Sequence, residues 1–210
     1  MARYTGPKTK ISRRFGEPVF GPDKYLDRRN FAPGQHGPAN KTRRRKLSDY
    51  GMQLREKQKA KYVYGMLEKQ FRRFYETARA RKGNTADLLL QLCESRLDNV
   101  VYRLGLAPTR PAARQLVTHR HVELDGRVVN VPSVIVPSFQ VRTGDTIEVK
   151  EDARSTQRFK DIEETAGGRI VPEWLDIDRE AMKGVVKEFP SREIIDVPVN
   201  ETLIVELYSK

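Results

Sequence analysis

The chain has 210 residues and a formal net charge of +12, with 32% charged and 38% hydrophobic residues. The hydrophobic share is enough for a small core, which argues against disorder over the whole length. The longest stretch without a charge, residues 128–141, has 14 residues and contains two prolines, whereas a membrane-spanning helix needs about 20 apolar residues. The sequence begins without the apolar core of a secretory signal, and its single cysteine, Cys93, has no partner for an internal disulfide. We therefore expect a cytoplasmic protein with no membrane segment.

The positive charge is concentrated in the first part of the chain. Residues 1–83 carry a net charge of +16, residues 84–150 carry +1 and residues 151–210 carry −5. Binding to a nucleic acid gains free energy when Lys and Arg neutralise phosphates and release counterions. A surface that serves only solubility usually mixes both signs, and the run from Arg43 to Lys46 does not. The distribution favours nucleic-acid binding over a purely solubilising role.

Residues 1–46 show glycine–proline pairs and almost no helical or alternating pattern, which is typical of extended chain interrupted by turns. Their net charge is +10. Charge repulsion disfavours collapse of such a segment, so we expect an extended arm that becomes ordered against a partner.

Two helices are predicted next. Ser48 is a typical N-cap for a helix that runs to about Lys61, and a second helix is expected over residues 66–82, between two glycines. The second helix has a basic face, opposite an apolar face made of Leu67, Phe71, Phe74 and Ala78. We expect the apolar face in the core and the basic face available to a partner. For Tyr62 and Tyr64, in the basic connection, stacking on a nucleotide remains open beside simple packing.

A third helix is predicted from the N-cap Thr85 to Gly105, with Cys93 on its buried side. A thiol that acts as a nucleophile or metal ligand needs a nearby base or further ligands, and the sequence identifies none. Cys93 is therefore expected to be a core residue.

A short fourth helix has the most informative charge pattern. Thr109 is a suitable N-cap, and the helix is expected to end near Thr118. Arg110 and Arg114 are spaced i, i+4, so they share a face. Cations near a helix N-terminus oppose the macrodipole, at about 0.3–1 kcal/mol each, whereas a phosphate there would meet guanidinium and backbone N–H groups together. We therefore expect an anion site, which Arg110→Ala with Arg114→Ala should weaken without unfolding the protein. The polar surface continues at the helix exit with Gln115, His119, Arg120 and His121.

From His121 the hydrophobic pattern changes to a period of two, which predicts a small antiparallel sheet. The expected strands cover residues 122–124, 128–129, 134–136 and 146–149, with a turn at Asp125-Gly126. The fold class is therefore α+β.

The acidic end of the chain is expected to begin with a charged helix or linker over residues 151–173. The alternation over residues 203–208 predicts a final strand. We expect this end to pack on the basic helices and to present Glu201 and Glu206 to a basic neighbouring protein.

Several segments resemble a known family of RNA-binding proteins. The sequence SRLDNVVYRLG of residues 95–105, with Thr109-Arg110, ARQLV at 113–117 and VELDG at 122–126, is similar to the RNA-binding module named after small-subunit ribosomal protein four. Further matches to that family lie outside the module, in MARYTGPK, APGQHG, LSDYG, QLREKQ, YG, QFR, NE and LIVELYS. Because they cover essentially the whole chain, it is identified as a member of the bacterial family of small-subunit ribosomal protein four.

This resemblance implies both architecture and function. It implies a mainly helical domain built from N- and C-terminal parts, with an inserted RNA-binding module of two helices packed on a small antiparallel sheet. The implied segments are a basic arm, a first helical part, the module with its connecting segment, and a C-terminal part that completes the helical domain, at residues 1–46, 47–92, 93–173 and 174–210. The resemblance also implies direct binding to small-subunit ribosomal RNA at a multi-helix junction of the 5′ domain. Nucleation of subunit-body assembly, contact with small-subunit protein five, a contribution to translational accuracy and proximity to incoming messenger RNA (mRNA) are further implications.

The sequence departs from its relatives in two places. Many relatives have a four-cysteine zinc site in the arm, whereas this arm contains no cysteine, so we expect no metal and no cofactor. Relatives often have glycine after the fourth helix where this chain has Arg120. If that turn needs a positive φ, arginine costs about 1 kcal/mol there.

We expect ribosomal RNA to be bound by basic, polar and aromatic side chains of the arm, the helices and the module. These are Arg3, Lys8, Lys10, Arg13, Arg14, Arg28, Arg29, His36, Lys41, Arg43, Arg44, Arg45, Lys46, Arg55, Lys59, Lys61, Tyr62, Arg72, Arg73, Thr109, Arg110, Arg114, Gln115, His119, Arg120 and His121.

An RNA-modifying enzyme is the alternative, because Arg96-Leu97-Asp98 resembles the tripeptide around the catalytic aspartate of pseudouridine synthases. Such an aspartate needs a substrate pocket built by a separate large sheet, and no segment of sufficient length remains for one. We therefore expect no enzyme, and a salt bridge or helix cap for Asp98 near the arginines of the module.

Overall fold

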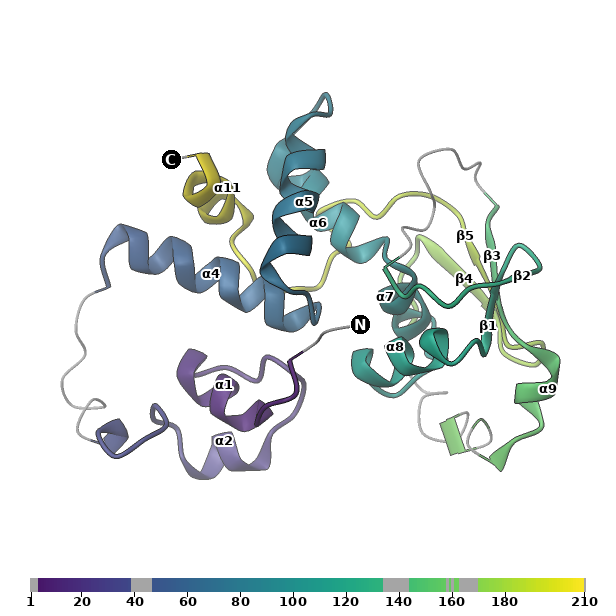
Figure 1. Ribbon diagram of the computed structural model, residues 1–210, viewed down its shortest axis with the longest axis horizontal. Helices are drawn as coiled ribbons and strands as arrows, with labels where there is room; N and C mark the ends of the chain where they lie inside the picture. Colours follow the sequence, from purple (N-terminus) through teal and green to yellow (C-terminus); the bar gives the residue numbers. More distant parts are fainter. Residues whose placement is uncertain are drawn as a thin grey trace. The chain divides into compact units, whose positions relative to one another are not determined.

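The computed structural model describes residues 4–38, 47–133, 144–157, 159, 161–162 and 170–209. The chain forms two compact units, one made of residues 1–86 and 197–210 and the other of residues 87–196. In chain order, the helices and strands shown in Figure 1 are α1 (Lys8–Phe15), α2 (Lys24–Arg28), α4 (Asp49–Val63), α5 (Glu68–Arg79), α6 (Thr85–Glu94), α7 (Leu97–Arg103), α8 (Arg110–Thr118), β1 (Val122–Leu124), β2 (Arg127–Val128), β3 (Thr146–Val149), α9 (Glu151–Arg154), β4 (Leu175–Asp178), β5 (Lys183–Val186) and α11 (Glu201–Ser209). The fold is α+β, as the sequence predicts.

The two long helices of the first unit form where their caps and periodicity predict. The Ser48 side chain accepts a hydrogen bond from the backbone N–H of Gly51 at 3.2 Å and so begins α4. On α5, Phe71, Phe74 and Ala78 are buried as expected. Leu67, assigned to the same face, is instead 42% exposed because it lies at the N-cap, before the helix begins.

The expectation of an extended arm is wrong for residues 4–38. Ile11 and Phe15, spaced i, i+4 on α1, are buried with Val19 in a small apolar cluster, against which Tyr62 and Val63 of α4 pack. This burial stabilises a helix whose remaining residues are mostly basic and polar, and the glycine–proline pairs only separate the short elements.

The predicted final strand is also wrong, because residues 201–209 form α11. Asn200 Oδ1 accepts a 3.4 Å hydrogen bond from the backbone N–H of Leu203 at the start of the helix. Ile204 is fully buried, and α11 packs along α4, where Gln53 Nε2 donates to Glu206 Oε2 at 2.9 Å. The alternating residues belong to a nearly continuous apolar run, in which period alone does not separate a strand from a buried helix.

The helices of the second unit differ from prediction at one point. The single helix expected over residues 85–105 is two helices, α6 and α7, separated at Ser95 and Arg96. Arg96 has an extended backbone, with φ −71° and ψ 139°, and is the N-cap of α7. Cys93 is fully buried, as expected, and burial raises the pKa of its thiol.

A five-stranded antiparallel sheet in the order β2-β1-β3-β5-β4 completes the second unit (Figure 1). Strands β1, β2 and β3 lie close to their predicted positions, whereas the strand predicted at 134–136 lies outside the described residues. Strands β4 and β5 were not predicted. Their pairing with β3 places residues 174–196 in the unit of the module, not in the helical domain as expected.

The core of this unit lies between the sheet and the helices α7 and α8. It includes Val100 and Leu116 from the helices, Ile147 and Val186 from the strands, and Trp174. At Gly184 of β5, an added Cβ would lie 2.5 Å from Leu104 Cδ1 of α7. Only glycine therefore allows the strand to approach the helix this closely.

Candidate nucleic-acid interface

The fourth predicted helix is α8, and it begins as expected. The Thr109 side chain accepts a hydrogen bond from the backbone N–H of Ala112 at 3.3 Å, and Pro111 occupies the first turn. Leu116 and Val117 are fully buried, whereas Gln115 is exposed, so one side of the helix faces the core and the other the solvent.

Arg114 does not share an exposed face with Arg110. Its residue is only 7% exposed, and its Nη1 donates to Asp98 Oδ2 at 2.9 Å. Asp98 also accepts from Arg96, through Nε at 2.9 Å and Nη2 at 2.5 Å. The expected two-arginine phosphate site is therefore wrong in this respect, because Arg114 connects α8 to α7 inside the protein. Asp98 forms the salt bridges that the sequence predicts, and its 5% exposure makes it a poor candidate for the catalytic aspartate of an enzyme.

Arg110 remains at the surface, with a side chain that is 20% exposed. Its Nε donates to Asn99 Oδ1 at 2.7 Å, and its guanidinium lies over the Tyr102 ring, with Cζ 4.6 Å from the ring centroid. The Glu94 carboxylate lies behind it, 4.0 Å from Arg110 Nη2, and accepts two bonds from Arg103 at 2.8 and 3.0 Å.

The exit of α8 presents further polar groups to solvent. Gln115, His119 and Arg120 are exposed, as is the cap residue Thr109. His121 is half-buried and lies edge-on to Phe159, with 6.4 Å between the ring centroids. We define the α8 surface as Thr109, Arg110, Gln115, His119, Arg120 and His121.

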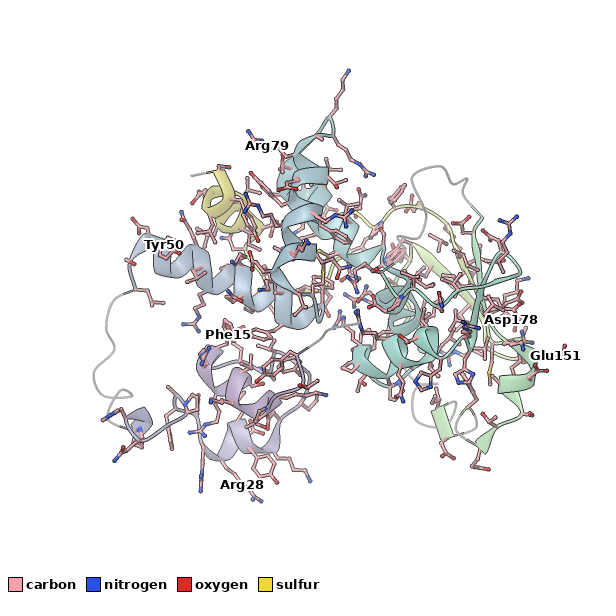
Figure 2. The ribbon with its side chains drawn as sticks, viewed as in Figure 1. Phe15, Arg28, Tyr50, Arg79, Glu151 and Asp178 are labelled. Atoms are coloured by element: carbon pink, nitrogen blue, oxygen red, sulfur yellow. The ribbon has the colours of Figure 1, made fainter. Side chains whose placement is uncertain are left out.

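A second basic surface lies on α1 and α2, which pack against each other. Its predicted members are all exposed, and Figure 2 shows Arg28 at the outer edge of α2: they are Lys8, Lys10, Arg14, Arg28 and Arg29. The sequence analysis missed Lys24 and Tyr25, which lie on the same pair of helices, and Tyr25 is 63% exposed. An aromatic residue among lysines and arginines is the signal that marks it. We call these seven residues the α1–α2 surface.

Two other predicted residues of the arm differ from each other in their surroundings. Arg13 donates to the backbone carbonyls of Phe31 at 3.0 Å and Ala32 at 3.4 Å, so it holds the chain that follows α2. His36, in contrast, is exposed.

A third basic surface follows the outer face of α5. Its exposed bases recur at helical spacing, opposite the buried Phe71 and Ala78, and Arg79 lies near the end of the helix (Figure 2). Arg72 also pairs with Glu76 at 3.2 Å. We define the α5 surface as Lys69, Arg72, Arg73, Arg79 and Lys82; of these, Lys69, Arg79 and Lys82 were not among the predicted site residues.

The predicted bases of α4 are engaged within the first unit. Arg55 donates to the backbone carbonyl of Phe15, and Lys59, only 6% exposed, pairs with Glu17. Lys61 pairs with Glu68 at 2.7 Å. The structure therefore gives these three side chains internal partners and leaves them less suited to RNA than the exposed bases.

Glu68 is a hub of this internal network. Burial alone would raise the pKa of its carboxyl, but hydrogen bonds from Lys61, Tyr208 and Lys57 lower that pKa to about 2. Tyr62 contacts other rings edge-on, including Tyr4 at 5.3 Å between centroids, and Tyr64 is 4% exposed. Packing, not base stacking, explains both tyrosines.

Six predicted RNA-binding residues lie outside the described ranges: Arg3, Lys41, Arg43, Arg44, Arg45 and Lys46. Within those ranges, no group of three or more His, Cys, Asp or Glu side chains is arranged to hold a metal ion. None of the helices in the described part of the chain has the length and apolar character needed to cross a membrane.

Comparison with known proteins identifies relatives along the whole chain. The family model of the ribosomal protein S4/S9 N-terminal domain matches residues 3–94, and that of the S4 domain matches residues 95–147. Small ribosomal subunit protein uS4 of Parabacteroides distasonis is 53% identical over 210 residues, that of Porphyromonas gingivalis 52% and that of Flavobacterium psychrophilum 50%. Each alignment covers 100% of this chain and 100% of the relative. The chain therefore belongs to the uS4 family of small ribosomal subunit proteins.

Proposed function

We propose that this protein is a structural constituent of the small ribosomal subunit in the cytoplasm and binds small-subunit ribosomal RNA directly. The observation that supports this most strongly is the set of three basic surfaces, on α1–α2, α5 and α8, in a member of the uS4 family. Exposed cations on several separate elements fit a partner whose phosphates are spread over several helices. The site is a multi-helix junction of the 5′ domain, and binding there nucleates assembly of the subunit body.

The module favours RNA over duplex DNA as the partner. A-form RNA hides its base edges in a deep, narrow groove, so a protein of this kind recognises shape through phosphates and 2′-hydroxyls. The short α8, with exposed polar groups at its start and exit, suits contact with backbone at a junction better than reading bases in a duplex groove.

Binding by the purified full-length protein tests this proposal. A transcript of the ribosomal RNA 5′ domain should bind much more tightly than a DNA duplex of equal length. Arg28→Ala combined with Arg73→Ala should weaken RNA binding, since each change removes an exposed cation from a basic surface. The matched control, Arg179→Ala with Lys187→Ala, makes the same change in net charge in the acidic β4–β5 region. Equal effects of the two pairs, or equal affinity for both nucleic acids, would contradict the proposal.

We further propose small-subunit protein five as a protein partner, with a shared contribution to translational accuracy, and mRNA as a neighbour where it enters the subunit. The acidic end of the chain supports a basic protein partner. Glu206 of α11 is exposed, and Glu201 is half-buried. Charge reversal of both glutamates should weaken association with purified protein five at low salt, and unchanged association would count against this contact.

An enzymatic function has no support in the structure. Asp98, the residue of the pseudouridine synthase alternative, is buried and paired with two arginines. Membership of a family of ribosomal structural proteins agrees with the expectation that the chain is no enzyme.

A further inference from the structure

Arg110 is held in one orientation by contacts of two kinds. Asn99 Oδ1 accepts from the edge of its guanidinium at 2.7 Å, and the Tyr102 ring lies against its face, 4.6 Å from Cζ. Long side chains at a surface normally sample many rotamers and lose that freedom when they bind a ligand. Arg110 has already lost much of it before any ligand arrives, while 20% of the side chain stays exposed.

The amide of Asn99 is itself fixed in direction. Its Nδ2 donates to the backbone carbonyl of Glu94 at 2.9 Å and to Glu94 Oε2 at 2.6 Å. The amide oxygen therefore faces Arg110. Glu94, whose side chain is 1% exposed, is held in turn by Arg103 through two hydrogen bonds. A buried hydrogen-bond relay thus runs from Arg103 through Glu94 and Asn99 to Arg110.

The charges of this region favour an anion in front of Arg110. The relay and the neighbouring Asp98 cluster contain two carboxylates, on Glu94 and Asp98, against four arginines: Arg96, Arg103, Arg110 and Arg114. The excess positive charge lies in a buried setting, where water screens it less than at an open surface. The backbone N–H groups at the start of the nine-residue α8 add to the same potential.

We propose that Asn99 and Tyr102 are positioning residues, which hold the Arg110 guanidinium in the orientation that binds an RNA phosphate. The geometry of this one guanidinium, not only its charge, then contributes to the affinity of the module. This inference rests on the proposed RNA-binding function and assigns the residues that orient its α8 surface. Bidentate phosphate binding needs a guanidinium in a fixed plane, which a lysine at the same position does not provide.

The first test compares charge-conserving and charge-removing changes in the full-length protein, with the 5′-domain transcript as the probe. Arg110→Lys should lose roughly tenfold in affinity, nearly as much as Arg110→Ala, because the lysine forms neither the bond to Asn99 nor the planar contact with Tyr102. Arg179→Lys and Arg179→Ala, in the acidic turn between β4 and β5, are the matched controls and should bind like the wild type. Wild-type binding by Arg110→Lys, with weakened binding by Arg110→Ala, overturns the positioning inference alone. Wild-type binding by Arg110→Ala overturns the α8 surface in the proposed function.

A double-mutant cycle separates positioning from general support of the fold. Tyr102→Leu should weaken RNA binding several-fold in the wild type and have no further effect in Arg110→Ala. Asn99→Ala should behave in the same way, and neither change should alter the salt dependence as strongly as Arg110→Ala, which removes a charge. The emission of Trp174, buried in the core of the same unit, reports whether each variant is folded. If Asn99→Ala unfolds this unit, the Tyr102→Leu cycle decides. Additive losses in that cycle overturn the inference.

Discussion

Two residues of the second unit have native environments that oppose their own chemistry. Arg120 has a φ of 63°, a region that favours glycine over arginine. Asp145 is 6% exposed, and its Oδ2 is one of two buried side-chain atoms in the described residues without a hydrogen-bond partner. Each therefore offers a substitution that should increase stability.

Arg120→Gly should raise the free energy of unfolding by about 1 kcal/mol, because glycine adopts a positive φ without the penalty of a Cβ. Arg120→Ala keeps the Cβ and should not be stabilising. Both variants should bind RNA more weakly than the wild type if Arg120 contacts a phosphate, with a salt dependence lower by about one contact. Urea unfolding followed by Trp174 emission and RNA titrations measure the two effects. A less stable Arg120→Gly variant would contradict the first expectation.

Asp145 should make stability depend on pH. Burial, together with the neighbouring Asp125 carboxyl, raises its pKa from 3.8 to about 6. The folded state therefore holds this proton more tightly than the unfolded state, so stability is greatest below pH 3.8 for this group and is lost as pH rises through about 6. Asp145→Asn should remove that decline and stabilise the protein at pH 8.

Thermal unfolding at several pH values measures the effect of Asp145→Asn. The exposed Glu173→Gln, in the same unit, is the control and should leave the pH profile unchanged. A wild-type profile in Asp145→Asn would show that another group causes the pH dependence.

Among the elements, those with local capping and amphipathic signals were predicted correctly from sequence. Ser48 and Thr109 cap helices as expected, and β1 and β3 follow their alternating pattern. The misassigned elements depend on contacts distant in sequence: α1 packs its two apolar residues against α4, and α11 also packs on α4. In β4 the alternation of Leu175 and Ile177 was present, but the intervening aspartates, which are uncommon in strands, obscured it.

The candidate site shows the same limit. Helical spacing placed Arg110 and Arg114 on one face of α8, but it does not show which of them another helix covers. The acid that buries Arg114 lies 16 residues away, on α7. Exposure of the bases on α5 was predictable, in contrast, because the opposite face is plainly apolar.

The α7–α8 connection should be essential for stability. Arg114→Ala should lower the free energy of unfolding by about 3–5 kcal/mol, because the change breaks a buried ion pair and leaves Asp98 with Arg96 alone. Urea unfolding followed by Trp174 emission is the measurement, with the exposed Gln115→Ala as a control for the helix itself. A stable Arg114→Ala variant with weakened RNA binding would restore the two-arginine phosphate site that the sequence predicts.

The docking of α11 should stabilise the helical unit. Ile204→Ala removes a fully buried side chain and should cost about 2–5 kcal/mol. Hydrogen exchange of the α4 backbone amides measures it, since α11 packs on α4. The exposed Thr202→Ala is the matched control. Unchanged protection of α4 in Ile204→Ala would mean that α11 does not support this helix.

For the whole molecule, the decisive feature is where the charge lies. The net +16 of residues 1–83 includes the exposed bases of the α1–α2 and α5 surfaces, whereas residues 151–210 carry −5. On the order of ten phosphate contacts make affinity fall by several powers of ten between low and moderate salt. Replacing Lys8, Lys10 and Arg14 together by Ala should lower the slope of log affinity against log salt by about one unit per lost contact. An unchanged slope would exclude α1 from the interface.

Crosslinking of the protein to RNA in living cells, followed by sequencing of the attached RNA, tests the central claim most directly. We predict that the reads concentrate at one multi-helix junction in the 5′ domain of small-subunit ribosomal RNA. Reads spread over messenger or transfer RNA, without a maximum at such a junction, would contradict the account.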